Sequence, residues 1–382
     1  MPKPAKNNTK QGIPWLFLII VFFTLRGLTL LAAIIGSRLL VFKNSFPYAD
    51  SVLLPYGQFL LWSWANFDGV HYLLLAEKGY AFGLTQAFFP VYPLLIKALS
   101  FFLQNRLLSG LLISHLSLFG AMVLLFKLIK DDFSDLIAKK TILSLILFPT
   151  AFFFLSLYTE SLFLFLLLLS FYLARKKRFI LAGLIGALAA ATRLVGIFLV
   201  FSFFYEWWIG KKKKISHLIG SLLPAAGLLV YMDYLGIRFG DPLIFFHVQN
   251  EFGAGRSGGN LILLYQVFWR YLKMILTVDR TNPIYFTVWL ELLSALFFLG
   301  LLIMAWLKGL KKNYLMFAFF AYLLPTLTGS FSSMPRYVLV LFPAFQLIGS
   351  TSSKFWYTLW LIISVVLLAI CTALFTRGYW IA

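Results

Sequence analysis

The sequence predicts an all-α protein that crosses a membrane many times, as a bundle of roughly eleven helices. Of its 382 residues, 61% are hydrophobic and only 12% are charged, about half the charged fraction of a soluble domain. Long apolar runs alternate with short basic clusters, which is typical of spans joined by cytoplasmic loops. The net charge of +20 is divided among these loops, which favours anionic lipid over nucleic acid as its partner.

The apolar runs define the expected spans. A helix needs about 20 mainly apolar residues to cross the hydrocarbon core. The runs that reach or approach this length are 13–36, 106–127, 141–157, 158–174, 179–192, 194–209, 215–234, 283–306, 314–329, 335–350 and 355–376. Because several are short, we expect tight helical hairpins within 141–174 and 179–209. The first run is longer than the core of a cleaved signal peptide, so we expect it to be retained.

The basic residues test this topology independently. One group precedes the first run, and others follow the second, fourth, sixth, eighth and tenth runs. These residues are Lys3, Lys6, Lys10, Lys127, Lys130, Lys139, Lys140, Arg175, Lys176, Lys177, Arg178, Lys211 to Lys214, Lys308, Lys311, Lys312 and Lys354. With a cytoplasmic N-terminus, all of them fall on the cytoplasmic side. We therefore expect a multi-pass integral membrane protein, a single domain over 1–382, whose site faces the external or luminal side.

The same parity places two long connections, 37–105 and 237–282, outside. The segment 88–103 in the first is apolar but too short to cross alone, so we expect an interfacial or re-entrant helix. The second contains a glycine-rich stretch and then a segment with helical periodicity, interrupted by Arg270 and Lys273. That pattern suits a helix in the interface, with these two side chains at the lipid headgroups.

The stretch from Trp62 to Pro93 concentrates polar residues in a chain with only 13 acidic residues and four histidines. A carboxylate at an outer membrane surface, here Asp68, can accept the proton of an attacking hydroxyl. Its alternatives are a helix cap or a partner of Lys78. His71 follows three residues later, so on a helix it shares a face with Asp68. It can orient that carboxylate, bind a phosphate or donate to a backbone carbonyl.

Other charges border the predicted spans. Glu160 and Arg193 lie at the outer ends of hairpins, where a charge is either functional or part of a structural pair. Arg336 is set among small polar residues, and its guanidinium suits bidentate phosphate binding. Arg256, in the glycine-rich stretch, can add to such an anion site together with Arg270, Lys273 and Arg280, and headgroup contact is the alternative for Arg270 and Lys273. Arg26 lies inside the first span and must find a partner, water or the interface.

We expect no metal and no cofactor. His71 has too few ligands nearby for a metal site. The acidic cluster Asp131, Asp132 and Asp135 lies among lysines on the predicted cytoplasmic side, which favours a solvated loop. The sole cysteine, Cys371, cannot form an internal disulfide or a cysteine-based zinc site.

Several segments together resemble the PIG-V-like mannosyltransferases, which belong to the GT-C class of membrane glycosyltransferases. The similar segments are Trp64–Tyr72, Ala76–Tyr80, Ala87–Pro93, Tyr158–Ser161, Ala191–Arg193 and Pro335–Tyr337. They follow the family's order and cover most of the chain. One departure is mild: the family's Trp-Asp pair is interrupted here, running from Trp64 to Asp68, with Phe67 directly before the aspartate.

The resemblance implies a GT-C-like bundle that transfers a sugar, a mannose-like hexose, from a polyprenyl-phosphate donor. The acceptor is a lipid-linked or cell-envelope glycan, and transfer proceeds with inversion and without metal. The catalytic acidic residue of the first external loop corresponds to Asp68. One base and one cation for the departing phosphate suffice chemically, so Arg336 and Arg193 form the expected phosphate clamp. Glu160 and His71 would position the acceptor or orient the base.

Aromatic residues of the expected active site, Tyr72 among them, can stack on the sugar ring.

Two other functions stay open for this chain. A transporter or flippase of lipid-linked or anionic solutes would place its site near the midplane between repeated halves. A non-enzymatic scaffold would leave the stretch around Asp68 unexplained. Convergence of Asp68, Glu160, Arg193 and Arg336 on one cavity favours the enzyme, and wide separation of Asp68 from both arginines removes the assigned roles.

Overall fold

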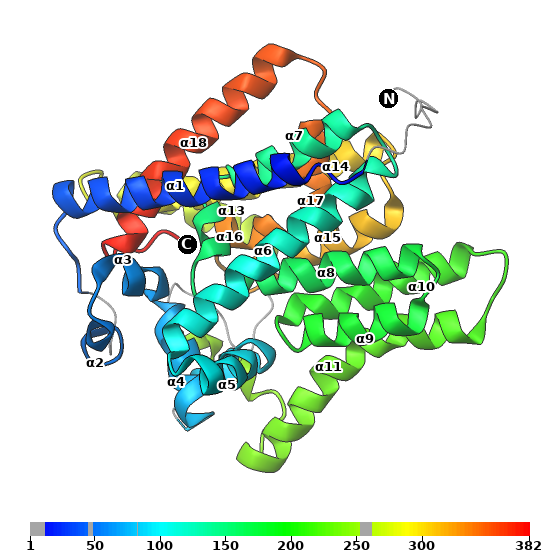
Figure 1. Ribbon diagram of the computed structural model, residues 1–382, viewed down its shortest axis with the longest axis horizontal. Helices are drawn as coiled ribbons and strands as arrows, with labels where there is room; N and C mark the ends of the chain where they lie inside the picture. The colour runs from blue at the N-terminus through cyan, green and yellow to red at the C-terminus, as the bar shows by residue number, and fades with distance from the viewer. Residues whose placement is uncertain (1–11, 45–48, 82, 253–261) are drawn as a thin grey trace.

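The computed structural model describes residues 12–44, 49–81, 83–252 and 262–382, and the regular secondary structure in these ranges is entirely helical (Figure 1). Within them, five helices are long and apolar enough to span a membrane. They are α1 (Trp15–Leu39), α6 (Arg106–Lys130), α11 (Ile215–Phe239), α14 (Ile284–Leu307) and α18 (Lys354–Thr376). These helices make the chain an integral membrane protein.

The remaining helices are shorter. The α-helices among them are α2 (Ala49–Val52), α3 (Phe59–Trp62), α4 (Asp68–Lys78), α5 (Val91–Leu103), α7 (Asp135–Ile146), α8 (Glu160–Arg175), α9 (Phe179–Ala190), α10 (Leu199–Ile209), α12 (Ile244–His247), α13 (Leu264–Thr277), α15 (Lys312–Thr326), α16 (Met334–Tyr337) and α17 (Phe342–Gly349). The 3₁₀ helices are η1 (Leu54–Tyr56), η2 (Ser63–Ala65), η3 (Thr85–Ala87), η4 (Ala151–Leu155), η5 (Leu194–Phe198), η6 (Val248–Phe252) and η7 (Val338–Val340).

Two of the expected spans are interrupted. In the run 141–157, helix α7 ends at Ile146, and the chain passes Pro149 before entering η4. In the run 335–350, α16 and η7 precede α17, and Pro343 lies at the start of α17. Proline disfavours helical backbone in the residue before it and lacks the N–H that a helix interior needs. The count of eleven spans and the interfacial placement of the short helices stay predictions.

Helices α8 to α11 form a closely packed group (Figure 1). Small residues let the backbones of α9 and α11 approach. A Cβ added to Gly227 on α11 would lie 1.9 Å from the carbonyl oxygen of Ala187 on α9. A Cβ at Gly183 on α9 would lie 2.3 Å from the carbonyl oxygen of Gly220 on α11. Any side chain at these positions forces the two helices apart.

The C-terminal end of the chain lies against the segment that precedes α4. Helix α18 runs along α1, and its last turn holds the segment before α4. The side-chain amide of Asn66 donates to the carbonyl oxygen of Phe375 at 2.9 Å. The ring of Phe67 packs edge-on against Trp380, with centroids 5.3 Å apart. The chain preceding Asp68 is therefore supported by residues more than 300 positions away.

Connections that the charge parity places in the cytoplasm also meet. Arg175 at the end of α8 donates to both carboxylate oxygens of Asp132, with Nη1–Oδ2 at 3.0 Å and Nη2–Oδ1 at 2.5 Å. Lys311, before α15, lies 2.8 Å from the same Oδ1. The Asp132 side chain is only 12% exposed, so the prediction of a solvated acidic loop is wrong for this residue. Its largely shielded position is stabilised by the two cations that neutralise it.

Candidate active site

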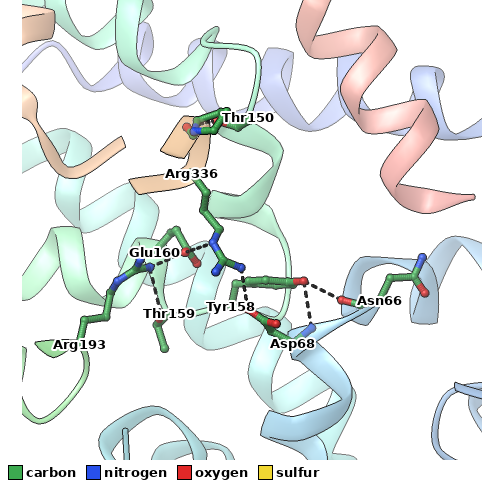
Figure 2. Close-up of polar contacts among 9 residues, drawn as sticks. Asn66, Asp68, Thr150, Tyr158, Thr159, Glu160, Arg193 and Arg336 are labelled. Atoms are coloured by element: carbon green, nitrogen blue, oxygen red, sulfur yellow. Dashed lines mark hydrogen bonds and ion pairs between the residues drawn. The ribbon is translucent and has the colours of Figure 1, made fainter. Parts of the chain in front are cut away.

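The segment leading into α4 has an unusual backbone. Phe67, directly before Asp68, has φ +60° and ψ −116°, a region that L-residues with large side chains rarely adopt. The hydroxyl of Tyr158 holds both sides of this residue: it donates to the carbonyl oxygen of Asn66 at 2.7 Å and accepts from the backbone N–H of Asp68 at 3.2 Å (Figure 2). One buried hydroxyl thus fixes the start of α4 and the direction of the Asp68 side chain.

The partner of Asp68 is Arg336. Its Nη1 donates to Asp68 Oδ2 at 2.6 Å, joining residues 268 positions apart. The structure shows neither of the two alternative roles for Asp68, a helix cap or a partner of Lys78. No side-chain hydrogen bond caps α4, and Lys78 lies at the opposite end of this 11-residue helix, about 15 Å away along its axis. The Arg336 side chain is only 9% exposed, so the pair is shielded from most of the solvent.

Glu160 lies between two guanidinium groups. Arg193 Nη1 donates to Glu160 Oε1 and also to the hydroxyl of Thr159 at 3.3 Å (Figure 2). Arg336 Nε lies 3.4 Å from the same Oε1. The Glu160 side chain is 1% exposed, and a buried carboxylate needs such compensation. The result is a row of alternating charges, Asp68–Arg336–Glu160–Arg193, which we call the charge row.

Separate elements deliver the members of the charge row. Arg193 lies in the turn between α9 and η5, where the backbone is extended at φ −150°. Arg336 lies on the short helix α16, and the carbonyl oxygen of Pro335 accepts a hydrogen bond from the Thr150 hydroxyl at 2.6 Å. Glu160 opens α8 and Asp68 opens α4. Helix N-termini favour carboxylates because the unpaired backbone N–H groups carry partial positive charge.

All members of the charge row line one cavity of about 510 Å³, a volume within the usual range for small-molecule sites. Most of the remaining wall is aromatic or aliphatic. It includes Tyr72, Phe88, Phe89, Leu194, Val195, Phe245, Phe246, Leu324, Pro325 and Trp380. The cavity therefore combines a charged end with an apolar wall. Such a shape suits a ligand that carries both an anionic group and apolar surface.

The N-terminal half of the chain matches a known family. A family model described as Mannosyltransferase (PIG-V) matches residues 18–209, half of the 382-residue chain. The chain belongs to the PIG-V mannosyltransferase family. No curated protein matches it. The matched range contains Asp68, Glu160 and Arg193, whereas Arg336 lies beyond it. Together with the apolar helices, the family makes this protein a membrane glycosyltransferase.

The other residues predicted for the site of this PIG-V family member differ in their placement. Tyr72 on α4 lines the cavity. His71 is not among the described residues lining it, and its ring stacks on Phe88 with centroids 4.7 Å apart. Burial lowers the pKa of His71, and the Asp68 carboxylate partly opposes this shift. Arg256 lies outside the residues that the structure describes.

Two further basic residues find partners that composition did not indicate. Arg270 was expected at the lipid headgroups, yet its Nη1 donates to the carbonyl oxygen of Gly329 at 2.9 Å. Arg270 is otherwise exposed, so its placement at the headgroups stays a prediction alongside this bond. Arg26, inside α1, lies over the Trp64 ring with its guanidinium carbon 4.5 Å from the centroid. A cation–π contact is thus its described partner.

Sequence reasoning missed two polar residues, one that lines this cavity and one that supports a loop of its wall. Tyr158 was noted only as part of a family-like segment, although it orients Asp68. Glu291 on α14 was not considered, although a carboxylate inside a candidate span is itself a functional signal. In the described part of the chain, no group of three His, Cys, Asp or Glu residues is close enough to hold a metal ion.

Proposed function

We propose that this PIG-V family member is an inverting, metal-independent glycosyltransferase of the GT-C type. It moves a mannose-like hexose from a polyprenyl-phosphate donor to a hydroxyl of a lipid-linked or cell-envelope glycan. The observation that carries this proposal is the charge row at one end of a largely apolar cavity. An anionic donor with a lipid tail matches both halves of that cavity.

The proposed chemistry is a single displacement. Asp68 accepts the proton of the acceptor hydroxyl while the oxygen of that hydroxyl forms a bond to the anomeric carbon. The bond from that carbon to the phosphate oxygen breaks, and its electron pair stays on the departing phosphate. Arg336 and Arg193 stabilise this growing negative charge. Attack opposite the leaving group inverts the anomeric centre.

The ion pair between Asp68 and Arg336 supports an order of binding. In the structure the proposed base, Asp68, is paired with the principal cation, Arg336, with Oδ2 and Nη1 2.6 Å apart. A donor phosphate offers Arg336 a second anionic partner, which frees Asp68 for the acceptor hydroxyl. We therefore propose that the donor binds first and that its phosphate prepares the base.

Glu160 is the less suitable carboxylate for the base. It is buried, and its Oε1 is engaged by Arg193 and approached by Arg336. We propose that it holds the two guanidinium groups in register. Tyr72 would flank the sugar from α4, and His71 would support Asp68 from the same helix. A contribution of Arg256 to phosphate binding stays a prediction.

We further propose a cytoplasmic N-terminus and an outward-facing site in one domain over 1–382. The charge row consists of residues that the charge parity assigns to the outer side. Arg175, Asp132 and Lys311, assigned to the inner side, contact one another elsewhere. This segregation supports the division of these residues between two faces, and the parity of the basic clusters predicts which of the two faces is outward.

The test is sugar transfer from a panel of polyprenyl-phosphate donors by purified, reconstituted protein. We expect Asp68→Asn to lower turnover about 10²- to 10⁴-fold, while donor binding persists. Asp50→Asn is the matched control, because Asp50 lies on α2 in the same external connection and is exposed.

Unchanged turnover in Asp68→Asn would remove the proposed base. Absence of transfer from every donor, together with movement of a lipid-linked sugar across the vesicle membrane, would replace the enzyme with a transporter.

A further inference from the structure

A second buried carboxylate lies beside the segment that carries Arg336. Glu291 is on the candidate span α14 and is 4% exposed. The Tyr271 hydroxyl of α13 donates to its Oε2 at 2.5 Å. The backbone N–H of Ser333 donates to its Oε1 at 3.1 Å. Ionisable groups within a membrane span are costly and are commonly retained for function, so this one requires an explanation.

Glu291 holds the loop 329–333, which leads directly into α16 and Arg336. Two residues of this loop have left-handed backbone conformations, Gly329 at φ +93° and Ser333 at φ +66°. A side chain at position 329 would be strained by this positive φ, and its Cβ would lie 2.5 Å from the Cδ1 atom of Ile262, so the loop favours glycine there. Serine at a positive φ is strained, and such a conformation persists only where its surroundings impose it.

Helix α13 and Glu291 together impose it. Arg270 donates to the carbonyl oxygen of Gly329 at 2.9 Å. The hydroxyls of Tyr271 and Ser330 lie 3.4 Å apart. With the bond from Glu291 to Ser333, this gives three anchors along five residues. Beyond them, the Thr150 hydroxyl donates to the carbonyl oxygen of Pro335, which leaves Arg336 with a fixed backbone.

The chemistry of the Glu291 site requires a carboxylate. A carboxylate offers two oxygens that only accept, and both receive donors here. Burial, together with the adjacent Glu291 carboxylate, raises the pKa of Tyr271, so its hydroxyl keeps the proton that it donates. A glutamine at this position would keep one acceptor and turn an NH₂ group towards one of the two donors.

We propose that Glu291 is a positioning residue for Arg336. Through Tyr271 and Ser333 it fixes the loop 329–333 and so determines where the Arg336 guanidinium meets the donor phosphate. This role rests on the proposed function, in which Arg336 binds that phosphate. The same proposal gives α13 a structural role, because Arg270 and Tyr271 of this helix contact the loop that leads to Arg336.

The test compares Glu291→Ala, Glu291→Gln and Tyr271→Phe with the wild type. We expect Glu291→Ala to raise the KM for the donor about tenfold or more, since a buried N–H and a buried hydroxyl lose their acceptor. The KM for the acceptor stays unchanged. Glu291→Gln, which keeps one acceptor, recovers part of this loss. The double variant Glu291→Gln/Tyr271→Phe loses less than the product of the single effects, because the two share one hydrogen bond.

Hydrogen exchange of the amides of 329–337, without substrates, provides the readout independent of activity. We expect faster exchange in Glu291→Ala and no change in α15. Glu206→Gln is the control: Glu206 is a partly buried carboxylate on α10 that Asn313 contacts at 3.3 Å, away from the cavity.

Unchanged exchange, or faster exchange with an unchanged donor KM, would overturn the positioning role. If the wild type transfers no sugar, the proposed function fails separately. Exchange and the affinity for a polyprenyl phosphate then decide the positioning role: weaker affinity with faster exchange supports it, and wild-type affinity overturns it.

Discussion

At the residue scale, a small number of polar contacts determines the position of Asp68. The backbone at Phe67 is strained, and the Tyr158 hydroxyl contacts the peptide groups on both sides of it. The contact reaches across 92 positions of the chain. Orientation of the proposed base therefore depends on a residue that need not touch any substrate atom.

Removing that hydroxyl alone tests this dependence. We expect Tyr158→Phe to lower kcat about tenfold and to reduce the free energy of unfolding by about 1–2 kcal/mol, because a buried N–H and a buried carbonyl lose their partner. Steady-state kinetics and thermal unfolding measure the two effects. Tyr265→Phe on α13 is the control, since Tyr265 is 68% exposed. Wild-type kinetics for Tyr158→Phe would show that the strained backbone holds Asp68 without help.

Sequence reasoning found the charged members of the site more readily than the neutral one. Asp68, Glu160, Arg193 and Arg336 stand out because charges are rare in an apolar chain, and the structure brings all four together. Tyr158 does not stand out, since tyrosine is common where membrane helices end. A hydrogen bond to a distant carbonyl leaves no local pattern. The roles of all these residues stay predictions until they are measured.

At the scale of the elements, hydropathy predicted apolar segments well and their backbone less well. The run 141–157 is apolar throughout, yet its second half is the 3₁₀ helix η4 rather than a continued α-helix. Phe152, Phe153 and Phe154 in that half are fully buried within the protein. Hydropathy does not distinguish a side chain that faces lipid from one that packs in a core. The proline before η4 was the available signal.

The contact between α9 and α11 gives an element-scale prediction. We expect Gly227→Val to destabilise the fold by about 1–3 kcal/mol or more, because its Cβ would collide with the Ala187 carbonyl oxygen. Gly300→Val on α14 is matched in chemistry and lies in open space, with nothing within 4 Å. Thermal unfolding in detergent compares them. Equal midpoints of thermal unfolding for the two variants would mean that α9 and α11 can move apart without loss of stability.

At the scale of the whole molecule, charge separates two faces. The charge row lies with the cavity, and the Arg175–Asp132–Lys311 contacts tie together other connections. The parity of the basic clusters, read from sequence, predicts which face is cytoplasmic. No membrane fixes that direction in the structure, because packing between helices is the same whichever side faces the cell interior.

Thiol labelling in intact cells tests the orientation. We expect a membrane-impermeant maleimide to label Asp279→Cys at once and Lys212→Cys only after the membrane is broken. Both positions are exposed, and the native Cys371 is buried, so the background reaction is small. The reverse pattern would invert the topology and place the cavity on the cytoplasmic side.

The pairing of Asp68 with Arg336 also bears on product release. A spent polyprenyl phosphate carries more negative charge than the sugar-linked donor, so two arginines retain it strongly. Asp68, once it has passed its proton to water, regains its charge 2.6 Å from Arg336 and competes for it. Under the proposed chemistry, the Asp68 carboxylate displaces the polyprenyl phosphate from Arg336 and so promotes product release. Each cycle then ends when the resting salt bridge forms again.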